Sequence, residues 1–131
     1  MLGNLEISAS GLEAHRIWMN TIAENIANAN TIERDGKNAP YRRREPIFSV
    51  DRQGNGSAVR VSAIVEDPSP FRVESDPSHP LRDENGNVAY PNVQVIQEMV
   101  DMMMANRSYE ANVTAMEVTK SMFSSALRIL A

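Results

Sequence analysis

The chain has 131 residues, the size of one ordinary domain. Hydrophobic residues make up 42% and charged residues 23%, which is typical of globular rather than disordered proteins. The formal net charge of -4 provides no general attraction to nucleic acid or anionic lipid, so we expect neither as a partner. The absence of cysteine excludes disulfides, thiolate zinc sites and a thiol nucleophile.

The beginning of the chain lacks the pattern of a cleaved secretory signal. Acidic residues stand where a cationic segment followed by an apolar one would be expected. No apolar run approaches the roughly 18 residues of a membrane span. If the protein leaves the cytoplasm, we therefore expect a different export route, and we predict no membrane-spanning segment.

The prolines divide the chain into three parts. All seven lie between residues 40 and 91, so both ends are free of the residue that most disrupts helices. The sequence therefore predicts a terminal helix in 1–31, a linker and β-rich segment in 32–91, and a second terminal helix in 92–131.

The N-terminal part carries a narrow apolar stripe. An apolar residue recurs at every seventh position, which predicts a helix over about 4–30 that packs along one face. The asparagine-rich run 28–31 indicates its end. The stripe and its flank four residues further along consist of Leu5, Leu12, Met19 and Ile26, and of Ala9, Arg16, Ala23 and Asn30.

The C-terminal part has the strongest pattern in the sequence, a seven-residue repeat over six cycles. It predicts a helix over about 93–130, with Asn92 as its N-cap after Pro91. At 1.5 Å per residue, the two helices would be about 40 Å and 57 Å long. The repeat and its adjoining positions are Val95, Met102, Tyr109, Met116, Phe123 and Leu130, with Met99, Val113 and Leu127.

The middle of the chain has the alternation of strands. We predict a β-hairpin of strands 47–50 and 59–65 joined by a turn at 54–56, and short strands at 71–73 and 88–90 on either side of a turn-rich loop. The predicted fold class is α+β, with long terminal helices packed as an antiparallel coiled-coil hairpin and a small central β-hairpin in an irregular segment.

Few residues suggest a catalytic or metal-binding site. Histidine beside acids on a turn-rich loop is usually solvated, so we predict no catalytic, cofactor-binding or metal-binding site. The run 83–88 starts like a calcium loop, but the sixth position is Val88 rather than glycine and the twelfth is Gln94 rather than glutamate. A hydrolase remains a competing hypothesis. The residues considered were His15, His79, Asp76, Asp83 and Glu84.

One basic cluster stands out, formed by Arg42, Arg43 and Arg44 beside Tyr41. Guanidinium groups bind phosphates or acidic protein surfaces. Because the rest of the chain is net negative, we favour an acidic protein partner or pairing within the chain over nucleic acid.

The terminal helices carry more large apolar residues than a two-helix packing can cover. An exposed apolar patch of this size usually marks an interface, so we predict assembly with other chains. Residues outside the main stripes include Ile7, Ile17, Trp18 and Ile22 in the first helix and Ile96, Val100, Met103, Met104, Val118, Met122 and Ile129 in the second. Six of the eight methionines lie in the second helix, and flexible thioethers suit surfaces with varied contacts.

Polar residues also enter the predicted interface. Asn25 and Asn28, three residues apart, are expected either to hydrogen-bond across helices and fix their register or to be solvated near the helix end. The predicted assembly interface comprises Leu5, Leu12, Met19, Ile22, Asn25, Ile26, Asn28, Met99, Met102, Tyr109, Val113, Met116, Phe123, Leu127 and Leu130.

Two sets of motifs resemble the bacterial flagellar basal-body rod proteins. The first is similar to a motif shared by rod and hook proteins and consists of SGLEA at 10–14 and IAENIANANT at 22–31. The second resembles the C-type proximal-rod subunits in particular and follows in order along the chain. It consists of PYRRR at 40–44, DPSPF at 67–71, DPSHP at 76–80, DENGNV at 83–88, PNV at 91–93 and SYEANV at 108–113.

The resemblance implies a non-enzymatic structural subunit of the proximal rod, without cofactors, which assembles helically through its terminal helices and transmits torque from motor to hook. It implies a periplasmic place in the basal body, reached by flagellar type III export without signal cleavage. Implied partners are other rod subunits, copies of the same chain, the base adaptor near the membrane ring and periplasmic ring proteins.

One segment departs from the family pattern, and one competing hypothesis remains. The segment IERDGK at 32–37 departs from the glycine-rich continuation common in the wider rod and hook group. The competing binding-module hypothesis is a self-contained coiled-coil adaptor or chaperone, whose helices would be stable in dilute solution.

Overall fold

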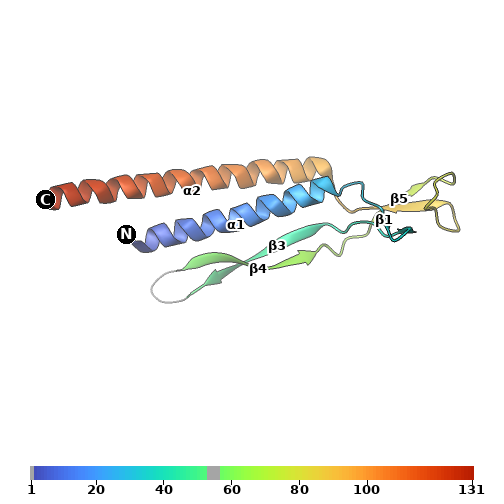
Figure 1. Ribbon diagram of the computed structural model, residues 1–131, viewed down its shortest axis with the longest axis horizontal. Coiled ribbons are helices and arrows are strands. Elements are labelled where there is room, and N and C mark those ends of the chain that lie inside the picture. Colours follow the sequence, from blue (N-terminus) through green and yellow to red (C-terminus); the bar gives the residue numbers. More distant parts are fainter. Residues whose placement is uncertain (1, 53–56) are drawn as a thin grey trace.

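The computed structural model describes residues 2–52 and 57–131. Two long helices, α1 (Leu2–Ala27) and α2 (Val95–Leu130), lie side by side and run in opposite directions (Figure 1). The first turn of α1 and the last turns of α2 therefore lie at the same end of an elongated molecule. This arrangement confirms the α+β class and the antiparallel helix pair.

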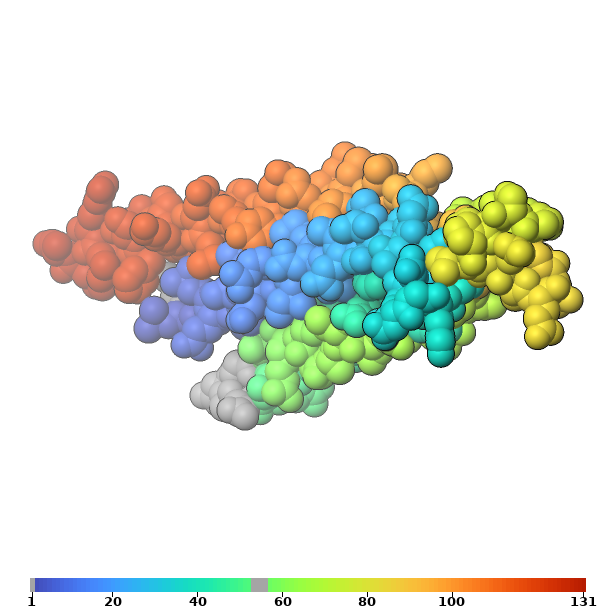
Figure 2. Space-filling view, turned by 45° about the vertical axis from the view of Figure 1, so that its right-hand side comes forward, coloured from blue at the N-terminus to red at the C-terminus, as the bar shows by residue number. Residues whose placement is uncertain are grey.

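The segment between the helices forms three two-stranded antiparallel ribbons within the described residues. The longest ribbon packs along α1, so that α1 lies between α2 and this ribbon (Figure 2). The two short ribbons extend beyond the start of α2. The pairs are β1 (Glu33–Arg34) with β2 (Lys37–Asn38), β3 (Arg44–Asp51) with β4 (Ala58–Glu66), and β5 (Arg72–Ser75) with β6 (Asn87–Tyr90).

The predicted strands are present, and those in β3 and β4 are longer than expected. The predicted turn at 54–56 lies outside the described residues. The β1–β2 ribbon was not predicted, although its turn has a recognisable signal: Asp35 and Gly36 have φ angles of 54° and 74°. Two successive positive φ angles are typical of the tight hairpin turns that Asp-Gly favours.

The helix ends differ from the predicted ones. The helix α1 ends at Ala27, because the next residues form tight turns in which the Ala29 N–H bonds the Ile26 carbonyl at 3.2 Å. The helix α2 begins at Val95, and Gln94 occupies the N-cap position without a side-chain hydrogen bond. The prediction of Asn92 as N-cap was therefore wrong.

The contact between the helices follows the predicted seven-residue repeat as far as Met116, and Val113 is the member of the predicted flank that lies between the helices. Met99 and Leu127 are exposed, whereas Glu98 and Ala105 are buried. Small and polar residues lie here because the helices approach closely: a Cβ added at Gly11 would lie 2.9 Å from Asn112 Nδ2. The predicted flank of α1, listed above from Ala9 to Asn30, is likewise exposed.

The molecule has a thin core and a large surface. Its accessible surface is 9173 Å², whereas a compact monomer of this mass would have about 6,900 Å². Ala14 and Ile22 are buried in the α1 layer, and Trp18 packs edge-on against Phe48 of β3 with ring centroids 6.0 Å apart. Within residues 2–52 and 57–131, neither helix has a stretch apolar and long enough to cross a membrane.

Candidate functional site: a polar junction and an uncovered helix pair

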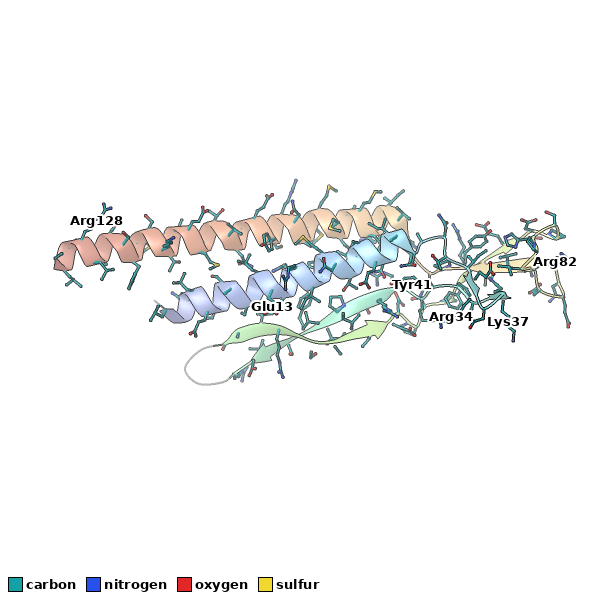
Figure 3. The ribbon with its side chains drawn as sticks, in the orientation of Figure 1. Glu13, Arg34, Lys37, Tyr41, Arg82 and Arg128 are labelled. Atoms are coloured by element: carbon teal, nitrogen blue, oxygen red, sulfur yellow. The ribbon has the colours of Figure 1, made fainter. Side chains whose placement is uncertain are left out.

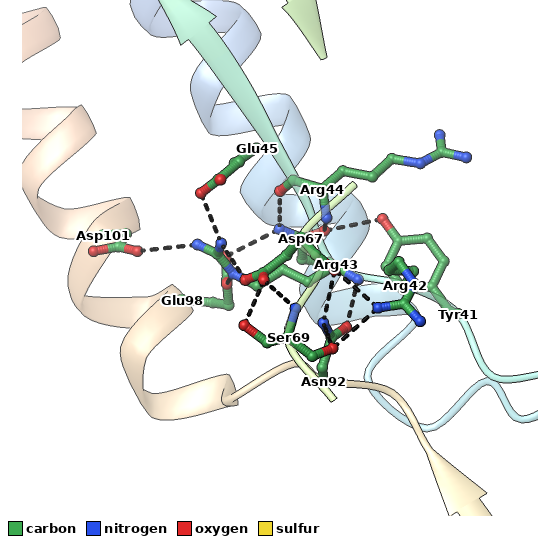
Figure 4. Close-up of polar contacts among 11 residues, drawn as sticks. Tyr41, Arg42, Arg43, Arg44, Glu45, Asp67, Ser69, Asn92, Glu98 and Asp101 are labelled. Carbon is green, nitrogen blue, oxygen red and sulfur yellow. Dashed lines mark hydrogen bonds and ion pairs between the residues drawn. The ribbon is translucent and has the colours of Figure 1, made fainter. Parts of the chain in front are cut away.

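A cluster of charges lies where α1 ends, α2 begins and β3 starts. Arg43 stands among four carboxylates that come from separate parts of the chain (Figure 4). Its guanidinium pairs with Glu98 of α2, and lies 3.1 Å from Glu45, 3.4 Å from Asp67 and 3.8 Å from Asp101. The Glu98 side chain is only 1% exposed, so this pairing replaces the water contacts that a carboxylate has at the surface.

Asn25 of α1 is the second centre of this junction, and its amide uses all four of its hydrogen-bonding positions. Its Nδ2 donates to Glu98 Oε2 at 3.2 Å and to the Arg44 carbonyl at 2.8 Å. Its Oδ1 accepts from the Tyr41 hydroxyl at 2.9 Å and from the Arg44 N–H at 3.0 Å. Of the two alternatives expected for Asn25, the structure therefore shows the hydrogen bond across the helices.

Asn28 behaves differently from Asn25. Its Nδ2 donates to the Glu24 carbonyl of the preceding helix turn at 2.9 Å, and its Oδ1 accepts from Thr31 at 3.2 Å. Asn28 therefore helps to end α1, which agrees with the alternative of a polar residue near the helix end rather than with a bond across the helices.

Asn92 ties two loops to the junction, which explains why it does not cap α2. Its Nδ2 donates to the carbonyls of Asp67 and Ser69, at 3.2 Å and 3.1 Å. Its Oδ1 accepts from the Arg43 N–H at 2.8 Å. The side chain thus holds the loop after β4 against the segment that enters β3.

The three adjacent arginines have different roles. Arg42 donates to the carbonyls of Asp67 and Ser69, each at 3.0 Å, and its guanidinium lies 4.1 Å from the centre of the Phe71 ring. Of the two alternatives expected for the basic cluster, Arg43 therefore shows pairing with acids within the chain, whereas Arg42 contacts backbone carbonyls and an aromatic ring. Arg44 is exposed, and its side chain makes no ion pair with the described residues.

The pKa values of Arg43 and Asp67 are shifted in the directions that favour their charged forms. Burial of the Arg43 guanidinium opposes its charge, but the hydrogen bond and charge of Glu98 outweigh this effect and raise the pKa of Arg43. Hydrogen bonds from Ser69, first from its hydroxyl and then from its N–H, lower the pKa of Asp67. Burial raises the pKa of Tyr41, which lies beside the end of α1 (Figure 3).

Three of the residues considered for catalysis, His15, Asp76 and His79, serve local structure. His79 Nδ1 accepts from the Leu81 N–H at 3.0 Å, and the Asp76 carboxylate accepts from Ser78. His15 Nδ1 donates to the Gly11 carbonyl one turn earlier on α1, at 2.7 Å. Across residues 2–52 and 57–131, no three His, Asp or Glu side chains are grouped so that they could hold a metal ion.

The structure places the predicted interface residues in three groups. One group lines a groove of about 440 Å³ between the two helices, together with Glu117 and Lys120. A second group is exposed on α2, and the remainder is buried or half-buried in the helix pair or near the junction. The first group is Leu5, Leu12, Val113 and Met116, and the second is Met99, Phe123, Leu127 and Leu130.

Sequence reasoning missed most of the junction. Glu98, Glu45, Asp67 and Asp101 were not singled out, because charged residues at those positions look solvated in a linear sequence. The only available signals were the basic cluster at 42–44 and an acidic residue, Glu98, at a position where the apolar repeat leads one to expect an inward-facing side chain.

Comparison with known proteins agrees with this architecture. The family model "Flagella basal body rod protein" matches residues 5–32, and "Flagellar basal body rod FlgEFG protein C-terminal" matches residues 84–129, so the two models cover most of α1 and α2. The chain is 39% identical to the flagellar basal-body rod protein FlgC of Borreliella burgdorferi, with 99% of this chain and 97% of the relative covered. It is 40% identical to FlgC of Bacillus subtilis (96% and 95% covered) and 38% identical to FlgC of Salmonella typhimurium (98% and 97% covered). The chain therefore belongs to the family of FlgC-type flagellar basal-body rod proteins.

Proposed function

We propose that the chain is a structural subunit of the flagellar basal-body rod, in its proximal part, and that it transmits torque from motor to hook. The observation that carries this proposal is the similarity to proteins named FlgC over nearly the whole of both chains. The chain acts by packing rather than by chemistry.

The surface of the helix pair supports assembly. Large apolar side chains are exposed along α2 from its first turn to its last, with Ile96 at 81%, Met103 at 58% and Leu130 at 84%. Such a surface is stabilised when neighbouring chains cover it. Because different faces of one subunit meet different neighbours, these contacts are heterologous and build an open helical array. Close-packed helices in such an array resist twisting.

The proposed partners are other rod subunits, further copies of the chain, the base adaptor near the membrane ring and periplasmic ring proteins. Arg44 is the member of the basic cluster that remains available to an acidic partner surface, because the residue is exposed and forms no ion pair with the described residues. The proposed location is the periplasmic part of the basal body, reached by type III export.

Cryo-electron microscopy of basal bodies isolated from the source bacterium tests the proposal. We expect density for this chain in the axial tube, and basal bodies from a deletion strain to lack a complete rod. Density for the chain only outside the tube, or normal rods in the deletion strain, would refute the proposal.

Limited proteolysis separates the rod subunit from a self-contained adaptor. At 1.5 Å per residue, α2 is about 15 Å longer than α1, so its last turns lack cover from α1. We expect cleavage within 117–130 in dilute solution and protection in isolated basal bodies. Equal resistance in both states would favour the adaptor.

A further inference from the structure

We infer that two copies of this chain pack with their α2 helices parallel and shifted by about ten residues, so that a methionine ridge of one copy enters an apolar groove of the other. This inference rests on the proposed function, because it specifies one contact within the rod. The apolar groove is lined by Leu5, Leu12, Val113 and Met116 and edged by Glu117 and Lys120. The methionine ridge is formed by Ile96, Met99, Val100, Met103 and Met104.

The groove is a hollow between the first half of α1 and the second half of α2. Two leucines of α1 form one wall, and Val113 and Met116 of α2 form the other. All four side chains are half-buried, so they present apolar surface without filling the space between the helices. A volume of about 440 Å³ is enough for several aliphatic side chains of a neighbour.

The ridge has the complementary shape and chemistry. Its five side chains are exposed over three turns of α2, Met104 for instance to 55%. The charged residues within these turns, Glu98 and Asp101, contact Arg43 in the junction and leave the outer face of the ridge uncharged. Unbranched methionine side chains fill an irregular groove readily.

Charges specify the direction and the shift. Arg107 and Glu110 follow the ridge along α2, with a positive charge before a negative one. Glu117 and Lys120 lie at the edge of the groove, with a negative charge before a positive one. None of these four residues forms an ion pair within the described part of the chain. With parallel helices and a shift of ten residues, Arg107 meets Glu117 and Glu110 meets Lys120.

The same shift aligns the apolar surfaces. Met103 of one copy then stands level with Val113 of the other, at the centre of the groove. With antiparallel helices and Met103 still level with Val113, Arg107 would stand level with Tyr109 and Glu110 with Asn106, so neither ion pair would form. Met103 and Val113 lie about 80° apart around α2, so each copy offers its ridge to one neighbour and its groove to another.

Cysteine cross-linking tests the arrangement directly, since the chain has no cysteine of its own. In the variant Met103→Cys/Val113→Cys, the two sulfurs of one copy are about 15 Å apart along the helix, too far for an internal disulfide. We expect covalent dimers and longer oligomers on oxidation of the full-length protein at high concentration. The matched control Met122→Cys/Val113→Cys should stay monomeric.

Three outcomes of this experiment would overturn the inference. They are the absence of covalent oligomers, equal cross-linking of the control, and dimers of the Met103→Cys single variant, which would indicate like surfaces facing each other. Both variants should also be followed into isolated basal bodies. If the chain is present in basal bodies but does not cross-link, the inference fails and the proposed function stands. If the unmodified chain is absent from basal bodies, the proposed function fails.

Charge reversal tests the direction independently. Glu117→Arg and Arg107→Glu should each weaken self-association about fivefold, because an attraction becomes a repulsion. In an equal mixture of the two variants, the reversed residues face each other and association should recover. Arg34→Glu is the control, since Arg34 is exposed on β1 and lies outside both helices. Sedimentation velocity measures each case, and an equal loss in the mixture would refute direct pairing.

Discussion

The two partners of the buried ion pair in the junction should differ sharply in their effect on stability. Arg43→Leu leaves the Glu98 carboxylate 1% exposed with one remaining side-chain donor, Asn25. Glu98→Leu leaves Arg43 19% exposed, with Glu45, Asp67 and Asp101 still within ion-pair distance. Loss of the arginine should therefore be the more damaging change.

The magnitudes follow from what each substitution leaves behind. Removing one partner of a buried ion pair costs about 3–5 kcal/mol, because the other charge stays desolvated. We expect this loss for Arg43→Leu. Glu98→Leu should cost about 1.5–3 kcal/mol, the range for a hydrogen bond to a charged group. The double variant should lose no more than Arg43→Leu alone, since its apolar side chains replace the whole pair.

Urea denaturation of the dilute protein, followed by far-UV circular dichroism, measures these losses as changes in the free energy of unfolding. Glu45→Gln is the matched control, because the Glu45 side chain is 46% exposed and should contribute less than about 1 kcal/mol. If Glu98→Leu costs as much as Arg43→Leu, or if the two losses add in the double variant, the carboxylate does not depend on the arginine and the reasoning is refuted.

Three further predictions concern packing and pH. Gly11→Ala should change the free energy of unfolding by less than about 1 kcal/mol, since better helix propensity offsets displacement of the Asn112 side chain, whereas Gly11→Leu should cost about 1–3 kcal/mol in urea denaturation. Ile22→Ala should cost about 2–5 kcal/mol by opening a cavity, but Ile129→Ala, at 85% exposure, should change stability by less than about 0.5 kcal/mol in the same assay. The lowered pKa of Asp67 means that its stabilising contribution is present above its unfolded pKa near 3.8 and is lost as the pH falls through the folded value. Ser69→Ala should raise the pKa of Asp67, which an NMR titration would measure, and should make less of the stability depend on acid pH. An unchanged pKa would contradict the Ser69 hydroxyl as the cause of the shift.

The helices and their order were predictable because their signals are local and repeated. Proline-free ends and a seven-residue apolar repeat are enough to indicate two helices that must cover each other. The β3–β4 hairpin was predictable from strand alternation. The β1–β2 ribbon had a signal in the Asp-Gly pair at 35–36, but its two-residue strands are too short to show an alternation.

The junction was not predictable because its partners are far apart in the chain. Arg43 and Glu98 are 55 residues apart, and Arg43 and Asp67 are 24 apart. Their contact depends on where α1 ends, which was predicted three residues too late, and on the loop that Asn92 holds. Met99 was predicted to face α1 for a related reason. The residue that faces inward there is Glu98, and because it is polar, an apolar pattern favours its neighbour Met99.

The junction explains how a helix pair with so many interchangeable apolar contacts keeps one register. A seven-residue apolar repeat is nearly unchanged when one helix slides by seven residues, so the stripe alone specifies alignment weakly. A slide of that size would bring Ala105 or Pro91 to the place of Glu98, and neither side chain can accept the hydrogen bonds of Asn25 and Arg43. Buried polar groups without partners would make such a register costly. Because these polar contacts align the helices from one end, the apolar side chains along the rest of α2 are not needed to specify the register.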